Sequence, residues 1–128
     1  MSANDRQVGG GHYKGEYQHW DYVIEADIPY MLACPLKYIK RWRSKNGLED
    51  LKKAQHFLEK SIESDVHHIM CYESDLWLLE KYLEMVDGAL EKEISKLIVM
   101  GDLSGALEAL TEMIDQEEHG ATRAYVDQ

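Results

Sequence analysis

The sequence predicts an all-α protein, a helical bundle of four to five helices. Apolar residues recur every three or four positions along most of the 128 residues, which is the period of one face of an α-helix. No segment shows the strict alternation of a half-buried strand, and only two prolines and nine glycines interrupt the chain. Two of the apolar stripes are long for one small core, so we expect the bundle to be completed by homo-oligomerisation.

The spacing places the individual helices in order along the chain. Proline fits the first turn of a helix, so the second helix is expected to begin at Pro35. Asn46-Gly47 marks a turn, and Asn46 with Glu49 resembles a capping box at the start of the third. Gly101 separates the last two predicted helices. The predicted helices cover residues 17–26, 35–44, 48–69, 74–97 and 103–114.

The length suits one domain that covers the whole chain. We divide it into a flexible arm at 1–11, a half at 12–72, an acidic helical hairpin at 73–119 and a frayed tail at 120–128. No apolar run approaches the ~20 residues of a membrane span, and the first residues lack the apolar core of a signal peptide. Cys34 and Cys71 are too few for a disulfide scaffold. We therefore expect a cytoplasmic protein with no membrane partner.

Charge is distributed very unevenly. The formal net charge is −10, yet residues 37–53 hold seven of the fourteen lysines and arginines. Residues 59–118 hold sixteen acids against four bases. The net charge makes a nucleic-acid partner unlikely, because binding to a phosphate backbone needs positive surface. The acidic C-terminal half could instead bind a host protein.

The basic segment is the strongest candidate site. Lys37 and Arg41 lie one helical turn apart, and Lys45 continues in the same direction. Arginine binds phosphate through two hydrogen bonds and lysine through a point charge, so the set suits a nucleotide. Tyr38 and Trp42 could supply a stacking surface for the base. The helical period places Leu36, Ile39 and Trp42 inward and Lys37, Lys40 and Arg41 outward. The alternative is therefore that Trp42 and Ile39 belong to the core and that the cations only form its solvated rim.

Three weaker patterns accompany it. His12, Tyr13 and Lys14 follow three glycines and could approach a phosphate, or they could belong to a flexible arm. The Walker spacing is absent from the sequence, which excludes an ordinary P-loop kinase. Asp50 could hold Mg²⁺ beside a phosphate, or could stabilise the start of its helix. His67 and Cys71 have the spacing of two zinc ligands, but no further ligands are evident.

Three segments of residues 11–63 follow one another in a characteristic order and spacing: HYKG, WDYVIEA and LKYIKRWRSKNGLEDLKKAQHFLEKSIE. In these segments the chain resembles a small phage-encoded family of nucleotide kinase-like proteins that lack a Walker loop. It departs from the family pattern at Phe57, where tyrosine is usual, and at residues 42–44, where the family has Ala-Gly. The positions that match are His12, Tyr13, Lys37, Tyr38, Arg41, Lys45, Asp50, Lys53 and Ala54.

The resemblance implies phosphoryl transfer to a deoxynucleoside monophosphate. Lys37, Arg41 and His12 would be the catalytic residues. Residues that would bind substrate are Tyr13, Lys14, Tyr38, Lys45 and Lys53. Mg²⁺, with Asp50 as its ligand, and ATP or another nucleoside triphosphate would be the cofactors. Two alternatives stay open: a non-catalytic protein that sequesters nucleotides to counter host signalling or defence, and an acidic helical protein that binds a host protein.

Overall fold

The computed structural model describes residues 3–5, 16–66, 68, 70 and 73–126, with side chains described as far as Gly120. All regular structure in these ranges is helical, which confirms the predicted class. None of the helices described is long and apolar enough to cross a membrane. A short 3-10 turn covers Ala3–Asp5, and the α-helices are α1 (His19–Glu25), α2 (Tyr30–Arg41), α3 (Leu48–Glu63), α4 (Glu73–Leu83), α5 (Ala89–Val99) and α6 (Leu103–Val126).

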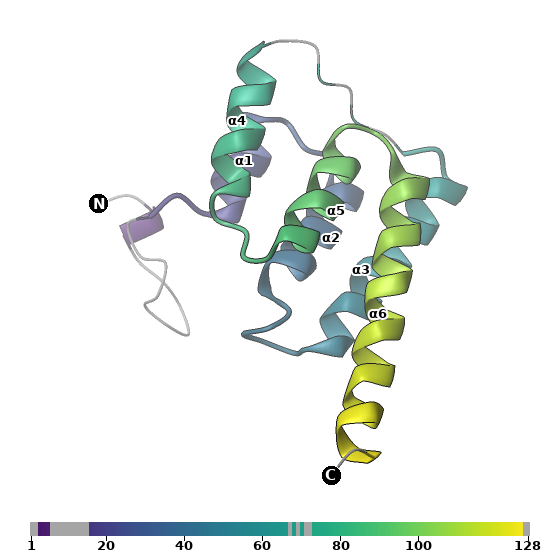
Figure 1. Cartoon of the computed structure of the whole chain (residues 1–128). Coiled ribbons are helices and arrows are strands. Elements are labelled where there is room, and N and C mark those ends of the chain that lie inside the picture. Colours follow the sequence, from purple (N-terminus) through teal and green to yellow (C-terminus); the bar gives the residue numbers. More distant parts are fainter. Residues whose placement is uncertain (1–2, 6–15, 67, 69, 71–72, 127–128) are drawn as a thin grey trace.

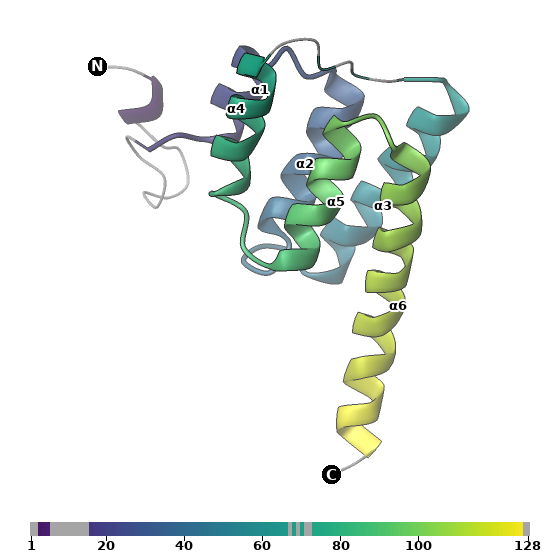
Figure 2. The same ribbon diagram turned by 45° about the horizontal axis from the view of Figure 1, so that its top comes forward.

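The helices form two stacked layers of three (Figures 1 and 2). The first layer holds α1, α2 and α3, and the second holds α4, α5 and α6. Across the layers α1 packs on α4, α2 on α5 and α3 on α6, and within them α2 contacts α3 while α5 contacts both neighbours. The two halves that we divided at residue 72 therefore share one core, and the expected C-terminal hairpin contains three helices.

Both layers contribute to this core. Leu36 and Ile39 of α2 are buried, as their spacing predicted. Full burial of such a side chain contributes roughly 1.5–3 kcal/mol, so the core dominates the stability of the fold. Tyr22 and Tyr82 stack with ring centroids 4.5 Å apart and join α1 to α4. Buried side chains from the other helices include Leu51, Leu58, Leu79, Ile94, Ile98 and Leu110.

The start of α2 differs from the prediction. The helix begins at Tyr30 with Pro29 as its N-cap, and Pro35 lies inside it. Proline has no N–H, so it leaves the carbonyl four residues earlier without its helical partner. That carbonyl belongs to Met31. The Ser61 hydroxyl of α3 lies 3.5 Å from it, but donates over a shorter distance of 2.7 Å to the Phe57 carbonyl of its own helix.

Two of the long helices that we predicted are shorter in the structure. The helix expected over 48–69 ends at Glu63, followed by Asp65 in a left-handed conformation with φ 55°. The Val66 amide donates to the Ser61 carbonyl over 2.8 Å, which closes the helix end. The helix expected over 74–97 is two helices, because Asp87-Gly88 forms a break with Gly88 at φ 91°.

The C-terminal helix is longer than predicted. We expected it to end near Ile114 and the tail to fray from Gly120, but α6 continues to Val126. Its last turns extend past the rest of the bundle, in yellow in Figure 1. Part of the expected N-terminal arm is also ordered against α1. The Asn4 side-chain oxygen accepts a hydrogen bond of 2.6 Å from Trp20 Nε1.

Candidate functional site

A pocket of about 200 Å³ lies where α1 meets the C-terminal end of α2. We call it the basic pocket, and it is lined by Gln18, His19, Lys37, Lys40, Arg41, Ser44 and Lys45. Three of these are the cations predicted to bind phosphate: Lys37, Arg41 and Lys45. The helical spacing of α2 explains the grouping, because Lys37, Lys40 and Arg41 share one face while Leu36 and Ile39 are buried.

The turn after α2 brings Lys45 to the same pocket. The Arg41 carbonyl accepts hydrogen bonds from the backbone amides of Ser44 and Lys45, at 3.0 and 3.1 Å. The Ser44 hydroxyl donates to the same carbonyl over 3.1 Å. These bonds cap the end of α2, so the turn that carries Lys45 is held by the backbone itself.

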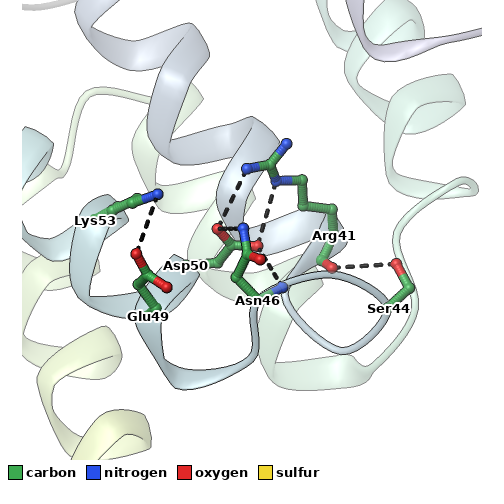
Figure 3. Close-up of polar contacts among 6 residues, drawn as sticks. All are labelled: Arg41, Ser44, Asn46, Glu49, Asp50 and Lys53. Atoms are coloured by element: carbon green, nitrogen blue, oxygen red, sulfur yellow. Dashed lines mark hydrogen bonds and ion pairs between the residues drawn. The ribbon is translucent and has the colours of Figure 1, made fainter. Parts of the chain in front are cut away.

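Arg41 is anchored to a fully buried carboxylate, that of Asp50 (Figure 3). Arg41 Nη2 donates to Asp50 Oδ1, and Arg41 Nε lies 3.3 Å from Asp50 Oδ2. The Asn46 backbone and side chain each donate to Asp50 over 3.3 Å. Burial alone raises the pKa of the Asp50 carboxyl, but the bonds from Arg41 and Asn46 outweigh it and hold that pKa below its ordinary value.

This geometry changes two predictions about the start of α3. The N-cap is Gly47 and no side chain caps the helix there, so the capping box of Asn46 with Glu49 is wrong. The Asn46 amide instead donates to Asp50. Both Asp50 oxygens are already engaged in a site closed to solvent, so this carboxylate has a structural role here and is not open to Mg²⁺. Among the residues that the structure describes, no group of three or more candidate ligands could hold a metal ion.

Arg43 is directed away from the basic pocket. Its Nε lies 2.9 Å from Oε2 of Glu91, a buried carboxylate at the start of α5. The indole N–H of Trp42 donates to the same oxygen over 3.2 Å. Trp42 is buried, so the prediction that it stacks on a base is wrong. Residues 37–45 are therefore divided: Arg41 and Arg43 pair with buried acids, while the three lysines of this segment line the pocket together with Arg41.

His19 enters the pocket from α1 and is held by the second layer. Its Nδ1 lies 3.2 Å from the hydroxyl of the buried Tyr82. The same hydroxyl donates to the Leu36 carbonyl over 3.3 Å, so Tyr82 links His19 of α1 to the backbone of α2. Burial, together with the nearby positive charges of Lys40 and Lys37, lowers the pKa of His19 to about 4. His19 is therefore neutral at pH 7.

Lys40 is the most enclosed of the pocket lysines. Burial lowers its pKa, although the carboxylates of Asp87 and Glu16 act in the opposite direction. Asp50 pairs with Arg41, and no carboxylate is among the described residues that line the pocket itself. The pocket thus has the charge and the donors that a phosphate group requires.

Tyr38 and Lys53 lie on the opposite side of Arg41. The Arg41 Cζ is 5.0 Å from the centroid of the Tyr38 ring, and Lys53 Nζ is 5.7 Å from it. Lys53 also pairs with Glu49 over 3.5 Å, as Figure 3 shows. Neither Tyr38 nor Lys53 lines the basic pocket, so the structure does not unite all the predicted binding residues in one place.

Other predicted residues fall elsewhere. His12, Tyr13 and Lys14 lie outside the described residues, as do His67 and Cys71 of the zinc pattern. Sequence reasoning missed Gln18, His19, Lys40 and Ser44. Lys40 carried a signal, since it lies on the predicted outward face beside Arg41. His19 carried none, because its partner Tyr82 is 63 positions away in the chain.

A family model described as a protein of unknown function (DUF3310) matches residues 9–59. This segment contains all the residues that line the basic pocket. The chain matches no curated protein and no solved structure.

Proposed function

We propose that this protein binds a nucleotide by its phosphate groups in the basic pocket. The observation that supports the proposal is the gathering of Lys37, Lys40, Arg41 and Lys45 around one hollow, with His19 and Ser44 as further polar groups. Lysine and arginine donate charge-assisted hydrogen bonds, which are the strong ones for phosphate oxygens. Arg41 is already fixed by Asp50, so it would lose little conformational freedom on binding.

We further propose that the bound nucleotide takes part in phosphoryl transfer to a nucleoside or deoxynucleoside monophosphate. An oxygen of the monophosphate attacks the γ-phosphorus of ATP or another triphosphate, the bond to the β–γ bridging oxygen breaks, and two diphosphates result. Such reactions depend mainly on positioning and on neutralising phosphate charge. Lys37 and Arg41 would supply that charge, and Mg²⁺ would arrive with the nucleotide. The resemblance of residues 11–63 to phage nucleotide kinase-like proteins supports this step.

Turnover tests the transfer directly. Purified protein is incubated with Mg²⁺, ATP and each nucleoside monophosphate in turn, and the nucleotides are separated by chromatography. We expect diphosphate to form with at least one acceptor. Replacing Arg41 with Ala should lower the rate at least ~10²-fold, as loss of a transition-state charge donor does.

Because Arg41 also holds the buried Asp50, Lys37→Ala is the cleaner variant. Lys37 is exposed, so its removal should lower turnover without unfolding the protein. Lys92→Ala is the matched control, since Lys92 is an exposed lysine of α5 away from the pocket. Equal turnover in Lys37→Ala and Lys92→Ala would contradict the assignment.

The second candidate is a protein that binds nucleotides without changing them. It is favoured by the absence of a carboxylate from the lining of the basic pocket, because no acid there is placed to accept a proton. In this case every nucleotide would be recovered intact, while calorimetry would still detect binding. Homo-oligomerisation and binding of a host protein stay predictions.

A further inference from the structure

A second hollow lies on the other side of α2, between α2 and α3. Its volume is about 230 Å³, and its lining combines Met31 of α2 with Lys53, His56, Phe57 and Lys60 of α3. The four α3 residues are spaced by three, one and three positions, so they share one helical face. We call this hollow the aromatic groove, because its apolar wall is centred on Phe57.

Aromatic rings extend the wall of this groove. Phe57 lies between two tyrosines: its ring centroid is 6.1 Å from that of Tyr30 and 6.0 Å from that of Tyr38. Tyr30 is 72% exposed, which is unusual for so large a ring beside other aromatic side chains. Exposed aromatic faces are the common stacking surface for nucleic-acid bases, because every base has a π-face.

Cations surround the aromatic wall. Lys53, Lys60 and His56 all line the groove. The ion pair of Lys53 with Glu49 is between exposed groups, so it would compete only weakly with an anionic ligand. An apolar, aromatic wall with a few cations at its edge fits a planar ring that carries a negative group.

We propose that the aromatic groove is a second nucleotide site, which stacks the base on Phe57 and Tyr30 and binds the phosphate with Lys53 and Lys60. The inference rests on the proposed function, because phosphoryl transfer needs a donor and an acceptor nucleotide at once. The groove contains lysines of its own. If it held only the base of a nucleotide whose phosphates lie in the basic pocket, it would require no cations.

Arg41 lies between the two sites. It lines the basic pocket, and its guanidinium lies over the ring of Tyr38, which in turn contacts Phe57. Lys53 of the groove also lies near this ring, with its Nζ 5.7 Å from the Tyr38 centroid. In the proposal, the phosphates of the two nucleotides are therefore both held close to Tyr38, and transfer between them requires such proximity.

Phe57 offers a specific probe of the groove, because it is the only phenylalanine in the sequence. Incorporation of 4-fluorophenylalanine gives a protein with one ¹⁹F resonance, located in the groove. AMP, GMP, CMP and dTMP are titrated separately, with pyrophosphate as a probe without a base. Calorimetry with pyrophosphate, compared between the natural protein and Lys37→Ala/Lys45→Ala, reports on the phosphate binding that depends on the basic pocket.

We expect at least one nucleotide to shift the ¹⁹F resonance in a saturable way, and pyrophosphate to bind without an equal shift. The shift should persist in Lys37→Ala/Lys45→Ala, which removes two exposed lysines of the basic pocket. In Tyr30→Ala/Lys60→Ala the dissociation constant from the shift should rise at least about tenfold, through lost stacking and charge. The matched control is Lys92→Ala/Lys96→Ala on α5.

Three results would overturn the inference, and they have different meanings. If the shift disappears in Lys37→Ala/Lys45→Ala, the groove holds the base of the nucleotide in the basic pocket and is not a second site. If no nucleotide moves the resonance while pyrophosphate still binds, the groove is not a nucleotide site and the proposed function stands. If neither nucleotides nor pyrophosphate bind, both proposals fail.

Discussion

The basic pocket and the aromatic groove share α2 as a wall, but they are chemically different. The residues that line the pocket are all polar or charged, and they include three lysines, Arg41 and a neutral histidine. The groove adds the apolar side chains of Met31 and Phe57, and its cations all come from α3. Arg41 lines the pocket and lies over the ring of Tyr38, which in turn contacts Phe57 of the groove.

The two layers contribute to these sites in different ways. Every residue that lines the basic pocket lies within the matched segment 9–59, and Lys60 of the groove lies just outside it. The second layer lines neither hollow, yet it supplies Tyr82, which holds His19, and Glu91, which holds Arg43. The part of the chain outside the matched segment therefore supports the site through Tyr82 and Glu91.

Replacing Asp50 should have the largest effect on stability, because Asp50 is the buried partner of Arg41. In Asp50→Ala the guanidinium of Arg41 loses its buried partner, and we expect the free energy of unfolding to fall by about 3–5 kcal/mol. Urea denaturation measures this. Glu49→Ala is the control, since Glu49 is an exposed neighbour on the same turn. Similar stability of the two variants would show that Asp50 is not an anchor.

The stability of the protein should depend on pH through His19 of the basic pocket. In the folded protein the pKa of His19 is lowered from 6.5 to about 4. Between these pH values the unfolded chain binds a proton at His19 and the folded chain does not. Stability contributed by neutral His19 is present above pH 6.5 and is lost as the pH falls towards 4. The loss amounts to up to about 3 kcal/mol.

The pH dependence is measured by urea denaturation between pH 7 and pH 4. His19→Asn keeps a side-chain donor for Tyr82 but cannot titrate, so it should lose less stability than the natural protein over this range. His56→Asn in the groove is the matched control, because His56 is exposed. If the free energy of unfolding changes equally with pH in His19→Asn and in the natural protein, folding does not keep His19 unprotonated.

The smallest effect is expected at Lys52, which lies next to Lys53 on α3. Lys52 pairs with Glu118 of α6 over 2.7 Å, and both side chains are substantially exposed. Exposed pairs of this kind contribute little to stability. Lys52→Ala should therefore leave the urea midpoint and the ¹⁹F titration nearly unchanged, whereas Lys53→Ala should weaken nucleotide binding in the groove. If Lys52→Ala and Lys53→Ala bind the nucleotide equally well, Lys53 does not belong to the second site.

Local spacing predicted the class of the fold and part of the site. It placed Lys37, Arg41 and Lys45 together because their relation depends on one helix and the turn after it. It did not predict the burial of Asp50, which depends on how α3 packs on α2. It also missed the break at Gly88, since the apolar stripe continues through it even though Asp87-Gly88 is a turn signal. His19 required knowledge of a contact between distant segments.

The pairing of Trp42 and Arg43 with Glu91 has a consequence for cooperative unfolding. These contacts fasten the end of α2 to the beginning of α5, on a carboxylate that is itself buried. Opening α5 would expose this charge network and remove the support behind the basic pocket. The backbone amides of α2 and α5 should therefore exchange with deuterium as a single unit, at rates slower than those of the projecting turns of α6.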